Sequence, residues 1–127
     1  MTGLSMTRGT TALIDTTVHY LQAGGLTGYS AWFTAKRDAA DPDAGAVFQK
    51  QIGSGIAAGS PTPGTGIYAG FYDAVLTTTV VPANTETLPA GYAHTLVWDV
   101  KVKDGSGIET TVDSGTLTVL ADVTQAI

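Results

Sequence analysis

The chain contains no cysteine, which excludes a disulfide framework, a thiolate nucleophile and a zinc site built on cysteine. Charge is also scarce, because Asp, Glu, Lys and Arg make up only 13% of the 127 residues. No apolar run is long enough to cross a bilayer, and none follows Arg8 as it would in a secretory signal. The sequence therefore predicts one domain with neither a membrane span nor a signal segment.

Basic residues are few and scattered. Six Lys and Arg stand against eleven Asp and Glu, which gives a formal net charge of -5, and the longest basic run is Lys36-Arg37. A chain of this charge repels phosphate backbones on average. We therefore expect no nucleic-acid partner and no membrane partner.

The clearest pattern in the chain is a β-hairpin in its last third. Leu96, Trp98, Val100 and Val102 alternate with more polar residues, and the turn 104–107 follows them. A period of two places the four apolar side chains on one face of a strand. The same alternation continues over 108–113, which predicts the return strand.

Similar alternation predicts further strands, and one helical turn is expected within 84–91. The predicted strands cover 12–21, 29–37, 46–52, 67–76 with a possible extension to 81, and 116–120. We therefore predict an all-β fold, an immunoglobulin-like β-sandwich of about seven antiparallel strands with no substantial helix, and a barrel is the alternative. Residues 1–10 are predicted to be an extended lead-in, and residues 11–127 one sandwich domain with a short C-terminal tail.

The inward positions of these strands define the expected core. They are Phe33, Phe71, Leu96, Trp98, Val100, Val102, Leu117 and Val119. Leu88 to Tyr92 resembles a tyrosine corner, in which a tyrosine hydroxyl binds the backbone of its own loop. An ordinary core or surface tyrosine is the other interpretation of Tyr92.

Two histidines could take part in acid–base chemistry. His19 and His94 each have an aspartate within several residues, Asp15 and Asp99. A catalytic triad also needs a nucleophile on a sharp turn, and no Gly-x-Ser-x-Gly motif occurs. We therefore expect both histidines to be structural or exposed, no catalytic residue, and a protein that is not an enzyme.

The acidic segment containing Asp38, Asp41 and Asp43 suggests a calcium loop. The spacing does not fit an EF-hand, because the twelfth position counted from Asp38 is Gln49 rather than a bidentate glutamate. The composition is typical of a solvated turn. We therefore expect no metal site and no cofactor.

Trp32, Tyr68 and Tyr72 are the aromatic residues with binding potential, because aromatic rings on an exposed sheet face can contact a sugar or a protein. Packing in the core or between the sheets is the alternative interpretation of all three.

Several short strings resemble a known family. They are Leu26-Thr27-Gly28-Tyr29-Ser30-Ala31-Trp32-Phe33-Thr34-Ala35-Lys36-Arg37, Asp41-Pro42-Asp43, Val47-Phe48-Gln49-Lys50, Leu88-Pro89-Ala90-Gly91, Trp98-Asp99-Val100-Lys101-Val102-Lys103-Asp104, Ser114-Gly115-Thr116-Leu117-Thr118-Val119 and Asp122-Val123-Thr124. In this order they resemble small virion proteins of tailed bacteriophages, in particular the N-terminal domain of baseplate upper proteins. The resemblance implies an immunoglobulin-like building block of a virion, made in the host cytoplasm and present in symmetric copies.

From this resemblance we expect a non-enzymatic structural subunit that contacts other virion proteins in the tail, the baseplate, a fibre attachment or a head decoration. The candidate interaction residues are Arg8, Trp32, Tyr68, Tyr72, Asp122 and Ile127. Deleting residues 1–9 is expected to leave the domain folded and to weaken incorporation into particles. The alternative function is a carbohydrate-binding or adhesion module, with calcium assistance as one form of it.

Overall fold

The structure is a computed structural model that describes residues 2–122. The described chain is almost entirely β-structure, and its longest helix has five residues. None of its helices is long and apolar enough to span a membrane. The elements are β1 (Thr2–Thr7), β2 (Ala12–Leu21), β3 (Ser30–Lys36), η1 (Asp43–Gly45), β4 (Phe48–Ile52), β5 (Gly55–Ala58), β6 (Thr62–Pro63), η2 (Gly66–Tyr68), β7 (Tyr72–Val80), α1 (Pro82–Glu86), β8 (His94–Lys103) and β9 (Glu109–Leu120).

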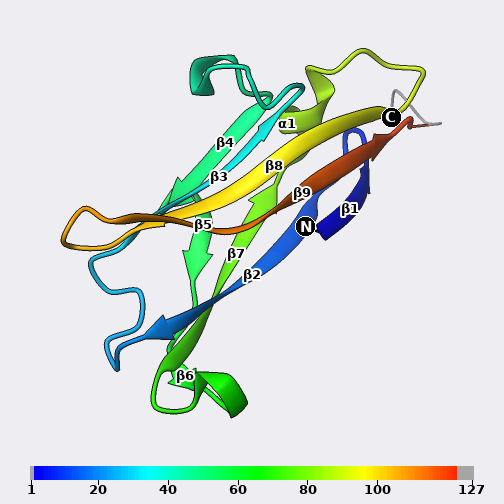
Figure 1. The fold of residues 1–127 in the computed structure, drawn as a ribbon. Helices are drawn as coiled ribbons and strands as arrows, with labels where there is room; N and C mark the ends of the chain where they lie inside the picture. Colours follow the sequence, from blue (N-terminus) through cyan, green and yellow to red (C-terminus); the bar gives the residue numbers. More distant parts are fainter. Residues whose placement is uncertain (1, 123–127) are drawn as a thin grey trace.

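The strands form one hydrogen-bonded sheet of nine strands that wraps into two layers (Figure 1). One layer has the order β1-β9-β8-β3-β4, and the other has the order β5-β7-β2, with β6 added to β7. The layers are joined where β4 and β5 pair in parallel over two residue pairs. The fold is an all-β, immunoglobulin-like sandwich, because its order matches the C, F and G strands in one layer and the B, E and D strands in the other.

Two details differ from the expected seven antiparallel strands. The pairings β1–β9 and β4–β5 are parallel, because the chain changes layers at the turn after β1 and at the turn after β4. The alternative, a barrel, is approached but not reached, since within residues 2–122 no ladder joins β1 to β2 and the sheet does not close. The sandwich is therefore open along one side.

The first residues are part of the sheet rather than a lead-in. Met6 is 7% exposed, and β1 pairs with β9 from Gly3↔Thr116 to Thr7↔Leu120. The prediction missed this strand because its few apolar residues only acquire a buried face once the distant β9 is in place. A deletion of residues 1–9 would remove a core side chain and a complete strand, so the expectation that it leaves the domain folded no longer holds.

The last strand is longer than predicted. The expected strands 108–113 and 116–120 form one strand, β9, which pairs with β8 from His94↔Val119 to Lys103↔Glu109. The register shifts between Val100 and Lys101, where one extra residue of β9, Val112, forms a bulge. Such a bulge bends the strand and increases its local twist, and here the ladder continues on both sides of it.

Phe71 is a correction to the expected core. Its side chain is 39% exposed, and β7 begins only at Tyr72. Gly66 and Gly70 have positive φ angles of 60° and 88°, so the chain turns through η2 instead of extending from residue 67. The inward residues of β7 are therefore the even-numbered set that begins with Ala74 and Leu76.

The other predicted core residues are buried: Phe33, Leu96, Trp98, Val100, Val102, Leu117 and Val119. Phe33 lies at the centre of an aromatic stack. Its ring centroid is 5.2 Å from that of Trp98 and 5.9 Å from that of Phe48, and all three rings are nearly parallel. The Trp98 indole also donates a 3.0 Å hydrogen bond to the carbonyl oxygen of Thr116 on β9. The stack connects three neighbouring strands of the larger layer.

Candidate interaction surfaces

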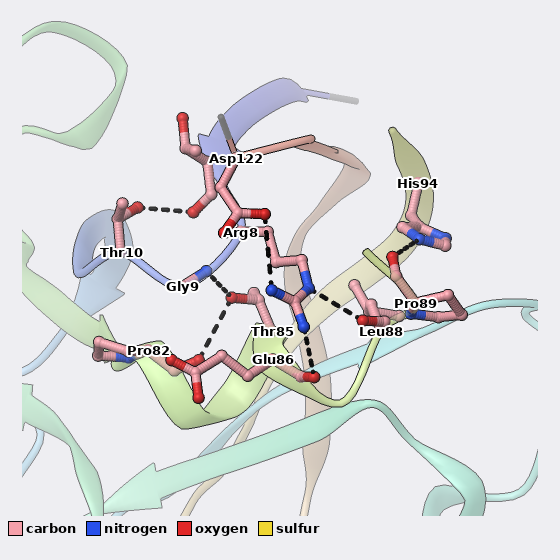
Figure 2. Close-up of polar contacts among 11 residues, drawn as sticks. Arg8, Gly9, Thr10, Pro82, Thr85, Glu86, Leu88, Pro89, His94 and Asp122 are labelled. Carbon is pink, nitrogen blue, oxygen red and sulfur yellow. Dashed lines mark hydrogen bonds and ion pairs between the residues drawn. The ribbon is translucent and has the colours of Figure 1, made fainter. Parts of the chain in front are cut away.

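The turn between β1 and β2 brings Arg8 to the end of α1. Arg8 N–H donates to the carbonyl oxygen of Leu120 at 2.9 Å, which ties the turn to the end of β9. Gly9 N–H donates to Thr85 Oγ1 at 2.8 Å, which ties it to α1. These two backbone contacts place the Arg8 side chain between α1 and the segment that follows β9 (Figure 2).

The Arg8 guanidinium contacts three groups from two distant parts of the chain (Figure 2). Its Nε and Nη2 donate to the carbonyl oxygens of Leu88 and Glu86, both at 3.0 Å. Its Nη1 lies 3.5 Å from Asp122 Oδ1, and the two side chains are only 16% and 13% exposed. Carbonyl groups at the C-terminal end of a helix have no hydrogen-bond donor within the helix. The guanidinium donates to the carbonyl groups at and just after the end of α1. We name this arrangement of Arg8, Glu86, Leu88 and Asp122 the Arg8 clamp.

The Arg8 clamp bears on two of the candidate interaction residues. Arg8 and Asp122 come together, but their charged groups face each other and are largely covered. In this arrangement they hold the two ends of the described chain on the sandwich rather than presenting charge to a partner. The third terminal candidate, Ile127, lies outside the described residues.

Trp32 lies on the outer face of the β9-β8-β3-β4 layer, in a groove of about 740 Å³. We call it the Trp32 groove, and its lining includes Trp32, Thr34, Lys36, Asp43, Gln49, Asp99, Lys101 and Ser114. The alternation that buries Ala31, Phe33 and Ala35 turns Trp32, Thr34 and Lys36 outward.

The ladder register explains why these side chains meet. Thr34 is opposite Gln49 on β4 and Asp99 on β8, and Asp99 is opposite Ser114 on β9. Trp32 is opposite Lys101. Gln49 Nε2 donates to Thr34 Oγ1 at 2.9 Å. One indole thus lies among an amide, hydroxyls and charges of both signs, an arrangement suited to recognition of a polar surface.

The acidic loop closes one end of the Trp32 groove and is organised by Lys36. The Lys36 ammonium lies 2.8 Å from Asp43 Oδ1 and donates to the carbonyl oxygen of Asp41 at 2.7 Å. Asp38 Oδ1 and Asp41 Oδ2 accept hydrogen bonds from backbone N–H groups of the same loop. Within residues 2–122, no three acidic or histidine side chains converge closely enough to hold a metal ion. The loop's own lysine occupies the position that a cation would take.

Lys36 lowers the pKa of Asp43 below its ordinary value of 3.8, through a hydrogen bond and through charge attraction. A carboxyl group whose pKa falls on folding stabilises the fold while it is ionised. That contribution is present above the ordinary carboxyl pKa and is lost as the pH falls through the lowered value. We expect Lys36→Met to raise the pKa of Asp43 toward the ordinary value, measured by NMR titration of the carboxyl carbon. Lys103→Met is the control, and an unchanged Asp43 titration in Lys36→Met would contradict the assignment.

Tyr68 and Tyr72 lie away from Trp32, so the three aromatic residues do not form one site. Both belong to the region where η2 meets β7, in the other layer, and both are half-buried. Tyr72 packs against the core. Tyr68 stacks on the ring of His19, with centroids 3.7 Å apart. The alternative interpretation, in which these tyrosines pack between elements, describes them better.

His19 pairs with an aspartate that the sequence did not indicate. Its Nδ1 lies 2.8 Å from Asp73 Oδ1 on β7, whereas Asp15 accepts a hydrogen bond from Thr77. Residues four apart along one strand are separated by about 13 Å, so the aspartate on the neighbouring strand is nearer. The next residue, Tyr20, has a φ of 61°, rare for a side chain of this kind, at the bulge that ends the regular pairing of β2.

The expected tyrosine corner is replaced by a histidine contact. Tyr92 is 59% exposed, and its ring lies 4.7 Å from that of His94. His94 Nε2 lies 2.7 Å from the carbonyl oxygen of Pro89, so His94 ties this loop to the start of β8 (Figure 2).

No protein-family model matches the chain, and no curated protein sequence matches it either. The sequence strings and the surfaces described above are therefore the features that bear on its function.

Proposed function

We propose that this chain is a non-enzymatic structural subunit of a tailed-phage virion that binds neighbouring virion proteins through the Trp32 groove. The string resemblance suggests the setting, and the groove is the observation that supports protein contact. It lies on the outer face of the larger layer and combines a tryptophan with Lys36, Lys101, Asp43 and Asp99.

These features suit a protein partner. Tryptophan contributes more binding energy at protein interfaces than most residues do, above all where it fills a concave site. Charges of both signs favour one partner and orientation over others. The Arg8 clamp holds both ends of the described chain against the sandwich, so a sheet face offers a better defined contact surface than either end does.

The Trp32 groove can be tested in assembled particles. We expect the double variant Trp32→Ala, Lys101→Glu to fold normally and to reduce its own incorporation at least about tenfold, because it removes an aromatic anchor and reverses a charge. Quantitative mass spectrometry of purified particles measures the occupancy. Tyr92→Ala is the matched control, since Tyr92 is an exposed aromatic residue outside the groove. Normal occupancy by the double variant would contradict the proposal.

The Trp32 groove also supports the second candidate, a carbohydrate-binding or adhesion module. An indole beside Gln49, Asp99 and Ser114 could stack on a sugar ring while the polar groups bind its hydroxyls. A glycan array on the isolated chain separates the two functions. Binding that is lost in Trp32→Ala favours the module, and the Lys36–Asp43 pair leads us to expect no calcium dependence.

A further inference from the structure

The outer edge of β2 has no hydrogen-bonded strand in the described chain. Within the described chain, β2 pairs with β7 alone, and no other segment forms a backbone hydrogen bond with residues 12–21. In an immunoglobulin sheet of the ABED type, the first strand lies next to the strand that corresponds to β2. Here β1 lies on β9 in the other layer, so that position is empty.

This edge is poorly protected against pairing with another chain. Natural edge strands are usually guarded by lysine, by proline, by a β-bulge or by a short length. β2 has ten residues with neither lysine nor proline, and its bulge lies at its far end, after Val18. Its one carboxylate, Asp15, accepts a hydrogen bond from Thr77 of β7. Leu13 is 69% exposed and lines a small cleft of about 170 Å³ between β1 and β2.

A second copy of the same chain fits this edge. An edge strand is complementary to itself across a twofold axis, because antiparallel pairing exchanges identical N–H and C=O groups. If the axis passes at Thr17, Asp15 of one copy lies opposite His19 of the other. Asp15, Thr17 and His19 occupy the same outward face of β2, so Asp15 meets His19, whose Nδ1 contacts Asp73 of its own copy and whose Nε2 has no contact with that aspartate, instead of another aspartate.

We propose that β2 pairs antiparallel with β2 of a second copy of this chain, across a twofold axis at Thr17, so that the two β5-β7-β2 layers form one continuous sheet. The inference deepens the proposed function and rests on it, because it names a second copy as one of the partners. The dimer is measured with the isolated chain, whereas the Trp32 groove is tested by occupancy in particles. A failure of one is therefore distinguishable from a failure of the other.

Disulfide trapping tests the register. The chain has no cysteine, so Thr17→Cys carries the only thiol. We expect mild oxidation to convert most of Thr17→Cys to a covalent dimer. Ser106→Cys, at the exposed tip of the β8–β9 hairpin, is the matched control and is expected to remain largely monomeric. Equal cross-linking of the two variants would overturn the register.

Sedimentation velocity tests the dimer itself. The wild-type chain is expected to sediment as a dimer, and Thr17→Lys as a monomer that keeps the wild-type far-ultraviolet circular dichroism spectrum, because two ammonium groups then face each other at the axis. Ser106→Lys is expected to remain dimeric. A monomeric wild type would overturn the proposal, as would a dimer that survives Thr17→Lys. A dimer that is lost only in Trp32→Ala would show that the copies meet through the Trp32 groove instead.

Discussion

Trp98→Ala is expected to lower the free energy of unfolding by about 3–5 kcal/mol. Trp98 is 4% exposed, and its ring stacks on Phe33, which in turn stacks on Phe48. The substitution leaves a cavity that the paired strands on either side cannot close, and it removes the hydrogen bond to Thr116. Chemical denaturation followed by circular dichroism measures the change.

The other tryptophan of the chain provides a matched control. Trp32 is on the same layer but faces outward, so Trp32→Ala is expected to cost about 1 kcal/mol or less. Trp98→Phe should recover much of the lost stability, because it restores most of the buried ring surface. Equal losses for Trp98→Ala and Trp32→Ala would contradict the assignment of Trp98 to the core.

Arg8→Ala is expected to lower the free energy of unfolding by about 2–4 kcal/mol, because it leaves a largely covered carboxylate without its cation. Two carbonyl groups, those of Glu86 and Leu88, lose their donors in the same variant. We expect the loss to weaken the attachment of β1 and α1 first. Faster hydrogen exchange in these two segments would show it.

A double-mutant cycle separates the contribution of the Arg8–Asp122 ion pair to stability from that of the two hydrogen bonds to carbonyl groups. Asp122→Asn removes the charge that Arg8 compensates, so Arg8→Ala with Asp122→Asn is expected to cost less than the sum of the single variants. Arg37→Ala is the control, because Arg37 is exposed. Strict additivity, or an effect of Arg37→Ala as large as that of Arg8→Ala, would contradict the clamp.

The Arg8 clamp changes which parts of the molecule are candidates for assembly. Arg8 and Asp122 first suggested contact segments at the two ends, yet they bind each other and α1. Within residues 2–122, the segments at the two ends therefore act in the fold, whereas the Trp32 groove and the β2 edge remain open.

Sequence patterns were most informative where one face of a strand is apolar and the other is polar. β2 was predicted with the observed bounds, and β3 and β8 within two residues at each end. In such strands a shift of one residue would expose every apolar side chain, so the pattern specifies the inward face. The burial of Phe33 and Trp98 follows directly from it.

Patterns failed where both faces are apolar or where the partner is distant in sequence. Phe71 was assigned to the core because either face of the region 67–76 could be buried, and positive φ angles at Gly66 and Gly70 decided against it. The pair of His19 with Asp73 could not be found, because it depends on the register of β2 against β7. The Trp32 groove could not be predicted for the same reason, because its lining side chains come from four strands and meet only through the register of those strands.

The sequence by itself determined the all-β class, the inward faces of the main strands and the exclusion of cysteine chemistry, because these depend on local alternation and composition. Only the tertiary structure decided that β1 lies on β9, that Arg8 binds Asp122, that Trp32 is separate from Tyr68 and Tyr72, and that the β2 edge is open. The physical reason is that each of these features joins segments far apart in the chain. Their side chains and backbone groups become partners only after the two layers have formed.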